Sequence, residues 1–204
     1  MVREVTVGLA LGVALVGAPA AAQTFAIDPA SSTATIEVGK AGLFSFAAGH
    51  THEVKGPIES GVVAIDVQDP AKSRVELVIA TAALKVTGKG DPPDDIPKVQ
   101  KAMEAENVLN VARYPRITFK SATVKGVPRD QASAFDVTLT GTLTIRDKSQ
   151  PVTVTVHVQR APGALTATGR FPIKQTAFGI QPISVAGVVK VEDELRITFS
   201  IVAK

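Results

Sequence analysis

The chain of 204 residues contains no cysteine and no tryptophan, and aromatic residues make up only 4% of it. The missing cysteine excludes disulfides, thiolate metal sites and a cysteine nucleophile. The scarcity of aromatic rings argues against a stacking platform for nucleic-acid bases. The net charge is only +3 and the basic residues are scattered. The sequence contains no stripe of basic residues that would indicate a polyanionic partner, so nucleic-acid binding is not expected.

The overall composition is that of a globular protein, with 45% hydrophobic and 20% charged residues. Disordered and fibrous classes are therefore excluded. No internal repeat, low-complexity tract or linker divides the chain after its first residues, which predicts one domain. A chain of this length can stabilise itself through its hydrophobic core, without disulfides.

The first 22 residues have the pattern of a secretory signal peptide. An apolar run over 5–16 is broken by Gly17 and Pro19, and three alanines at 20–22 form an A-x-A cleavage site. The run is too short for a membrane anchor, and no later segment approaches about 20 apolar residues. We therefore expect a domain over 23–204 that is exported, either to the periplasm or out of the cell, with no transmembrane segment after cleavage.

Alternation of apolar and polar residues dominates the rest of the chain and predicts strands. The clearest run places Phe135, Val137, Leu139, Leu143 and Ile145 on one face, with threonines and other polar residues on the opposite face. A second alternating run follows a polar turn at 147–150, so the two should form an antiparallel hairpin. About eight strands are expected, near 32–39, 54–67, 73–86, 116–125, 134–146, 151–160, 164–175 and 185–203, the last with room for two.

One segment interrupts the strands. Glycines and prolines at 88–93 stop any regular element, and Asp94 or Asp95 can then cap a helix that has Pro97 in its first turn. Val99 and Met103 lie one helical turn apart on one face. A short amphipathic helix over 95–107 should therefore pack on the sheet. The predicted fold is all-β, an antiparallel barrel of about eight strands with one short helix, because closing a series of long strands removes exposed edges.

Catalytic chemistry has little support in the sequence. No serine lies in a nucleophile elbow between a strand and a helix, and no glycine-rich loop is suited to cradling phosphate. The acidic runs are interpreted as a helix cap at Asp94 and Asp95, and as a solvated hairpin turn at 192–194. Neither enzymatic activity nor a cofactor is expected.

Two histidines offer an alternative function. His50 and His52 flank one residue, so in an extended segment their imidazoles point to the same side, where Glu53 or His157 could complete a metal site. The other interpretation is a polar loop with two ordinary histidines. His157 lies on the threonine face of its strand, which favours a surface position. A metal-binding module using His50 and His52 remains an alternative.

The eight phenylalanines can either fill a core or line a lumen. An eight-stranded barrel can hold one small ligand, and each buried methylene contributes roughly 0.8 kcal/mol. Burying an oily chain is the function that a motif-poor apolar barrel supports most easily. The candidate ligand-binding residues are Phe44, Phe46, Phe119, Phe135, Val137, Leu139 and Phe178. An interaction domain with a filled core is a further alternative. The oligomeric state is open, and a homodimer is compatible with the sequence.

Several motifs, taken in order, resemble the YceI-like family of exported bacterial proteins over roughly 25–203. They are FAIDPASS at 25–32, IEV at 36–38, VKG at 54–56, NVLNVARYPRITFKS at 107–121, GTLTIR at 141–146 with PV at 151–152, and FGI at 178–180. The resemblance implies a lipocalin-like barrel that binds polyisoprenoids or similar long-chain amphiphiles. Relatives usually carry Arg and Asp just before the Phe-Gly pair, where this chain has Gln175 and Ala177, so a head-group contact through that arginine is not expected here.

Overall fold

The computed structural model describes residues 22–41, 51–128, 130, 132–185 and 189–204. Their strands form one antiparallel sheet of twelve strands, and the main path has the order β1-β4-β5-β7-β8-β9-β10-β12-β2-β3-β6, with β11 paired to β12. The strands are β1 (Gln23–Ala26), β2 (Thr33–Ala41), β3 (His52–Pro57), β4 (Ser60–Ile65), β5 (Arg74–Ala80), β6 (Lys85–Val86), β7 (Arg116–Lys125), β8 (Ala134–Ile145), β9 (Lys148–Ala161), β10 (Ala164–Lys174), β11 (Ser184–Val185) and β12 (Val189–Ala203).

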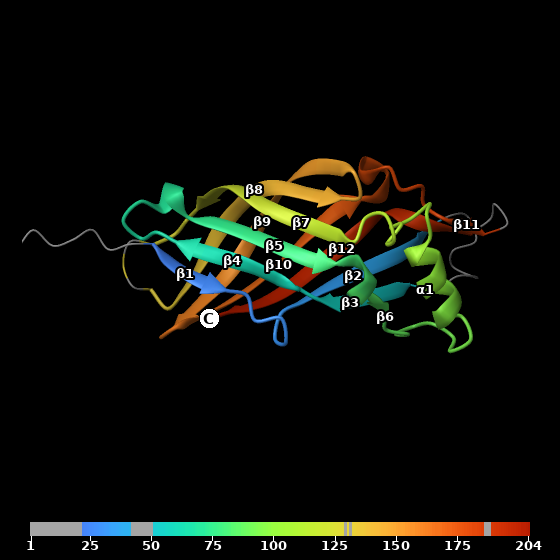
Figure 1. The fold of residues 1–204 in the computed structure, drawn as a ribbon, viewed down its shortest axis with the longest axis horizontal. Helices are drawn as coiled ribbons and strands as arrows, with labels where there is room; N and C mark the ends of the chain where they lie inside the picture. The colour runs from blue at the N-terminus through green and yellow to red at the C-terminus, as the bar shows by residue number, and fades with distance from the viewer. Residues whose placement is uncertain (1–21, 42–50, 129, 131, 186–188) are drawn as a thin grey trace, which may run out of the picture.

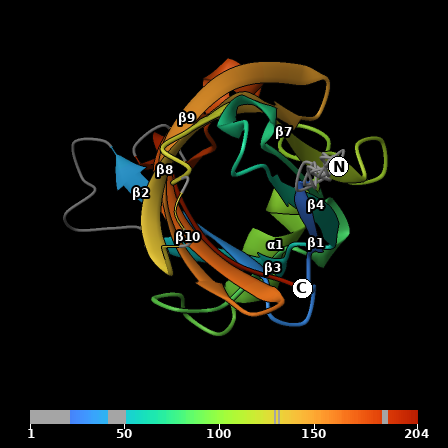
Figure 2. The ribbon, with the colours of Figure 1, turned by 90° about the vertical axis from the view of Figure 1, so that its left-hand side faces the viewer.

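The sheet curls around a central axis and carries one α-helix at one end (Figures 1 and 2). The two ends of the path, β1 and β6, form no ladder with each other in the part of the chain that is described. Instead, β1 returns to the end of β12, where the Ala26 amide donates to the Lys204 carbonyl at 2.7 Å and the Lys204 amide to the Ala26 carbonyl at 2.9 Å. The all-β, barrel-like fold class is confirmed.

The hairpin of β8 and β9 follows the alternation read from the sequence. Leu139 pairs with Val154, and the ladder continues without a break to Ile145 and Lys148. The predicted turn at 147–150 is wrong, because only Arg146 and Asp147 connect the strands and the turn is tighter. Arg146 adopts a left-handed conformation there, with φ of 58°.

Two predicted strands are each divided in the structure. The run at 54–67 is divided at Ile58 and Glu59, where the hydrogen-bond partner changes: the Ile58 amide donates to the Ser32 carbonyl of the segment leading into β2, and the Glu59 amide to the Val78 carbonyl of β5. The run at 73–86 is interrupted by a 3-10 turn, η2 (Thr81–Ala83). Buried Thr81 fixes that turn, since its hydroxyl donates to the Tyr114 carbonyl at 2.8 Å. Strand division accounts for much of the difference between eight and twelve strands.

Two further predictions need correction. The acidic run at 192–194 is not a hairpin turn but lies inside β12, where the register with β2 shifts between Val191 and Leu195. Phe25, which precedes the first expected strand at 32–39, belongs to an additional strand, β1. β1 pairs with β4, about 40 residues later in the chain, and at the acidic run Glu194 pairs with Lys174 of β10. Two short 3-10 turns, η1 (Pro70–Lys72) and η3 (Gln175–Phe178), complete the elements.

The predicted helix exists and is shorter than expected, as α1 (Ile96–Glu104) with Pro97 in its first turn. Asp95 occupies the N-cap position, but its side chain makes no capping bond. Lys98 Nζ instead donates to Asp95 Oδ1 at 2.7 Å. Val99 and Met103 pack against a buried cluster that includes Leu109 and Phe178. The helix therefore covers one end of the sheet, as Figure 1 shows.

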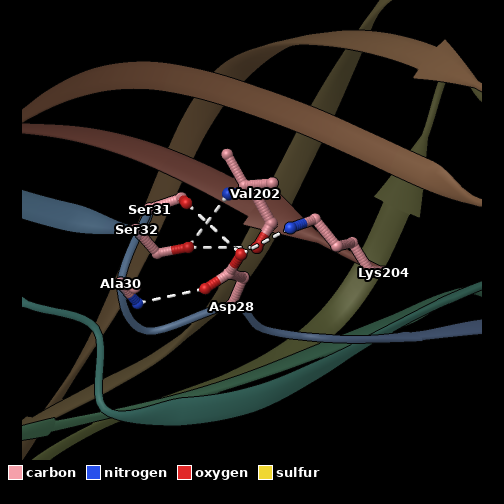
Figure 3. Close-up of polar contacts among 6 residues, drawn as sticks. All are labelled: Asp28, Ala30, Ser31, Ser32, Val202 and Lys204. Carbon is pink, nitrogen blue, oxygen red and sulfur yellow. Dashed lines mark hydrogen bonds and ion pairs between the residues drawn. The ribbon is translucent and has the colours of Figure 1, made fainter.

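At the opposite end, a group of polar contacts joins the segment before β2 to the end of β12 (Figure 3). The side chain of Ser32 is fully buried, and its Oγ donates to the Val202 carbonyl at 3.0 Å and accepts from the Val202 amide at 2.9 Å. Lys204 Nζ donates to Asp28 Oδ2 at 2.7 Å, and this bond lowers the pKa of Asp28. Side chains thus take part in holding the two chain segments together.

Ser32→Ala is expected to lower the free energy of unfolding by about 1–3 kcal/mol, because it leaves the Val202 amide without its acceptor and the Val202 carbonyl with the Asp28 amide alone. The matched control is Ser31→Ala, which removes an exposed hydroxyl that donates only to Asp28. Urea denaturation of both variants checks the prediction. Equal losses would mean that Ser32 has no special role in joining the segments.

Candidate functional site

A cavity of about 480 Å³ runs inside the curled sheet. Its wall comes from the inward faces of the strands and from α1. Among the described residues that line it, only four carry polar or charged side chains: His52, Ser73, Lys98 and Gln175. An interior of this volume and polarity is typical of a site for a small apolar ligand.

The inward face predicted for β8 is the one that lines the cavity. Phe135, Val137, Leu139, Leu143 and Ile145 all contribute to the wall. The alternate residues of β8 point away, and Thr140 Oγ1 lies 3.1 Å from Thr153 Oγ1 on β9. Five of the seven candidate ligand-binding residues therefore lie on the wall, namely Phe119, Phe135, Val137, Leu139 and Phe178. Phe44 and Phe46 lie outside the described residues.

Many residues of the cavity wall were not among the candidate ligand-binding residues predicted from the sequence. The inward rows of β9, β10 and β12 contribute Val154, Val156, Phe171, Ile197 and Phe199, and α1 contributes Val99 and Met103. The same alternation marks the three strands, so the signal was present. Membership of the wall depends on the curl of the sheet, which the alternation does not specify.

Two phenylalanine rings lie against glycines of neighbouring strands. A Cβ at Gly141 would lie 2.5 Å from Cζ of Phe119, and one at Gly169 would lie 2.5 Å from Cζ of Phe199. A side chain at either glycine would push the ring aside. The glycines thus allow both rings to lie close to the sheet, which leaves the space along the axis open.

At the α1 end, a histidine of the cavity wall contacts a buried acid. His52 Nδ1 lies 2.7 Å from Asp91 Oδ1, and the Asp91 side chain is fully buried. The side chain of Gln175 is also buried, and its Nε2 donates to the Glu192 carbonyl at 2.7 Å. The position where relatives usually carry an arginine is therefore occupied by an amide that bonds to the chain itself. Ala177 is exposed.

The metal-binding alternative gains no support from the described part of the chain. No cluster of three or more His, Asp or Glu side chains suited to a metal occurs among these residues. His50 lies outside them. His157 is exposed on the outward face, as predicted, with Nδ1 2.9 Å from Asp136 Oδ1.

The turn η3, which carries Phe178 into the cavity wall, is tied to β12 by Asp193. The Thr176 amide donates to Asp193 Oδ1 at 2.9 Å, and the Thr176 hydroxyl to Oδ2 at 2.8 Å. These bonds, the amide bond above all, lower the pKa of Asp193 below its usual value. The contribution of Asp193 to stability is therefore complete above the unfolded-state pKa of 3.8 and is lost as the pH falls through the lower folded-state pKa.

Asp193→Asn is expected to flatten part of the acid limb of the stability curve below the unfolded-state pKa of 3.8, since the amide cannot gain the proton. At neutral pH the variant should be slightly less stable, because a charged acceptor has been replaced by a neutral one. Thermal melts across this pH range check the prediction. A wild-type slope that Asp193→Asn leaves unchanged would contradict it.

Comparison with known proteins places this fold in a family. The family model for the YceI-like domain matches residues 25–203. The chain belongs to the YceI-like domain family. No curated protein matched the chain in the corresponding comparison.

Solved structures with the same fold cover most of the chain. BcnA of Burkholderia cenocepacia is 24% identical, with a TM-score of 0.61 over 87% of this chain and 99% of its own. A polyisoprenoid binding domain of Saccharophagus degradans, implicated in plant cell wall breakdown, is 14% identical, with a TM-score of 0.61 over 88% and 97%. The YCEI protein of Campylobacter jejuni is 14% identical, with a TM-score of 0.52 over 71% and 80%. At these identities the likeness concerns the fold.

Within the described part of this YceI-like chain, no helix is both long enough and apolar enough to cross a membrane.

Proposed function

We propose that this YceI-like protein binds one long-chain lipid, a polyisoprenoid or a similar amphiphile, inside the sheet and acts without catalysing a reaction. The observation that carries the proposal is the cavity of about 480 Å³ with a wall of aliphatic and phenylalanine side chains. Burying ten methylenes would contribute about 8 kcal/mol before the cost of association. The family and the polyisoprenoid binding domain among its structural neighbours support the same ligand class.

We also propose that the protein is exported. Support comes from the signal-peptide pattern at 1–22 and from the position of β1, which begins at Gln23, the residue after the predicted cleavage site. Amino-terminal sequencing of protein from the periplasm or the medium of a bacterial host should begin at Gln23. Retention of the full-length chain inside the cells would contradict export.

The test of lipid binding is to identify what co-purifies with the protein. Native mass spectrometry of freshly purified protein should show a complex with one long-chain compound, and organic extraction should release it. After delipidation, the protein should bind an added polyprenyl lipid. A protein that carries no lipid and does not bind the added one would contradict the proposed function.

A further inference from the structure

One arginine belongs to the inward row of β9. Val154, Val156 and Val158 are buried on that face and line the cavity, and Arg160 is the next residue in the same alternation. In the ladder with β10, Arg160 lies directly opposite Leu165, which is 2% exposed and also lines the cavity. Residues opposite each other in an antiparallel ladder point to the same face, so Arg160 points inward.

The guanidinium of Arg160 is buried without a hydrogen-bond partner. Nε, Nη1 and Nη2 are all inaccessible to solvent, and none has an acceptor within the part of the chain that the structure describes. The guanidinium lies over the ring of Phe135, whose centroid is 5.2 Å from the guanidinium carbon. Burying five N–H donors and a positive charge without an acceptor is unfavourable, so the arrangement calls for an explanation.

The acidic residue on the adjacent strand does not supply that acceptor. Asp136 of β8 faces outward, is exposed, and is paired with His157 of β9. Asp28, near the same end, accepts from Lys204 and Ser31. Both carboxylates are therefore engaged elsewhere, and Asp130, in the loop before β8, is exposed and makes no hydrogen bond to the guanidinium. An anionic ligand would supply the acceptor that Arg160 lacks among the described residues.

The position of Arg160 relative to the cavity identifies that ligand. Phe135, Val158 and Leu165, which surround Arg160 in the ladder, all line the wall. Leu165 pairs with Ala203 near the C-terminus, and Figure 1 shows the C-terminus at the end of the sheet away from α1. Arg160 is thus surrounded by residues that line the end of the apolar cavity opposite the helix, although it is not itself one of the lining residues.

The cation and the polar groups at the α1 end already have hydrogen-bond or ion-pair partners. Lys98 lines the cavity, but its side chain is 73% exposed and its ammonium is paired with Asp95. His52 is bonded to Asp91, and Gln175 to the Glu192 carbonyl. None of these three is a desolvated cation with free donors, so the two ends of the cavity are chemically unequal.

We propose that Arg160 binds the anionic head group, a carboxylate or a phosphate, of the lipid whose chain occupies the cavity. This inference rests on the proposed function and adds to it the chemical class and the orientation of the ligand. The planar guanidinium can donate two parallel hydrogen bonds to either group. The face of Phe135 holds the guanidinium in place, and the hydrocarbon chain extends from it toward α1.

The experiment compares three probes that share one chain: hexadecanoic acid, hexadecyl phosphate and hexadecanol. Delipidated wild-type protein should bind at least one of the two anions about tenfold or more tightly than the alcohol, since charge-assisted bonds to a buried guanidinium are strong. Arg160→Gln should lower the affinity for that anion to the level of the alcohol and leave hexadecanol binding unchanged. The preferred anion distinguishes a carboxylate from a phosphate head group.

The matched control is Arg170→Gln, which removes an exposed arginine of β10 whose Nε donates to Thr198 Oγ1 at 3.3 Å. It changes the net charge equally and should leave all three affinities unchanged. Wild-type protein that binds the alcohol as tightly as both anions would overturn the head-group role while leaving lipid binding intact. Failure of all three probes to bind would instead contradict the proposed function.

Thermal stability gives a second, independent measurement. In the lipid-free state, Arg160→Met should melt at a higher temperature than wild type, because it replaces a buried unpaired charge with an apolar side chain. Hexadecanoic acid or hexadecyl phosphate, whichever wild type prefers, should raise the Tm of wild type more than that of the variant. A lipid-free variant that melts below wild type would show that Arg160 serves the fold, and would overturn the proposal.

Discussion

Leu139→Asp is expected to unfold the protein or abolish lipid binding, whereas Thr140→Asp is expected to do neither. Leu139 is 7% exposed and lies in the wall of the cavity. Its loss removes about 2–5 kcal/mol of packing free energy. The new carboxylate would in addition be buried without a partner. A typical domain is stable by only about 5–15 kcal/mol, so the combined loss is a large part of the total.

Thr140 is the matched control because it is the next residue on the same strand and points to the other face. Its hydroxyl lies beside Thr153 on the outer surface of the sheet, and a carboxylate there stays hydrated. Thermal melts followed by circular dichroism, together with lipid content after purification, check both variants. Equal effects, or a larger effect at Thr140, would mean that this face of β8 does not form the wall.

The alternation of apolar residues was sufficient to predict which face of β8 and β9 is buried. A shift of one residue exchanges the two faces and loses the hydrophobic contribution of the whole row, so the pattern specifies the register strongly. The row of Phe135, Val137 and Leu139 lines the cavity for this reason. Family membership was also readable from ordered motifs, even though none of them is diagnostic alone.

Other features depend on contacts between segments that are distant in sequence. The division of 54–67 into two strands follows from a change of hydrogen-bond partner between Ile58 and Glu59. The acidic residues at 192–194 resemble a turn locally, but β12 continues through them with a shift of register. Local composition carries no information about either event, so the sequence alone does not predict them.

The inward position of Arg160 has a signal in the sequence, but the signal is ambiguous by itself. Arg160 lies in phase with Val154, Val156 and Val158, which is visible in the sequence. A charged residue at the end of a strand usually faces water, however, and a side chain that alternates inward can still reach solvent at a rim. Only the register with Leu165 and the burial of its three guanidinium nitrogens show that this arginine is desolvated.

The choice between a filled core and a lumen also depends on shape. Apolar rows of identical composition can interdigitate or can surround a space, according to how the sheet curls and where rings lie. In this chain Phe119 and Phe199 lie close to the sheet over Gly141 and Gly169. The two glycines can be seen in the sequence, but the phenylalanine rings that lie against them belong to neighbouring strands. Their effect on the cavity therefore cannot be predicted from the sequence.

A tryptophan placed in the lumen separates these two possibilities. Val156 is 4% exposed, lines the cavity, and pairs with Val137 on one side and Gly169 on the other. Val156→Trp is expected to abolish co-purification of lipid with little change in Tm, because the large ring occupies space that the lipid chain would take. In a filled core the same ring would cost about 1–3 kcal/mol or more by overpacking.

Thr155→Trp is the control for Val156→Trp, since Thr155 is the preceding residue and is exposed on the outer face. It should retain lipid. The chain has no native tryptophan, so the emission of the introduced ring reports its surroundings directly. Blue-shifted emission, a nearly unchanged Tm and loss of lipid together identify a ligand-binding lumen. A strongly lowered Tm for Val156→Trp would instead indicate a filled core, because only a packed interior has to be displaced to admit the ring.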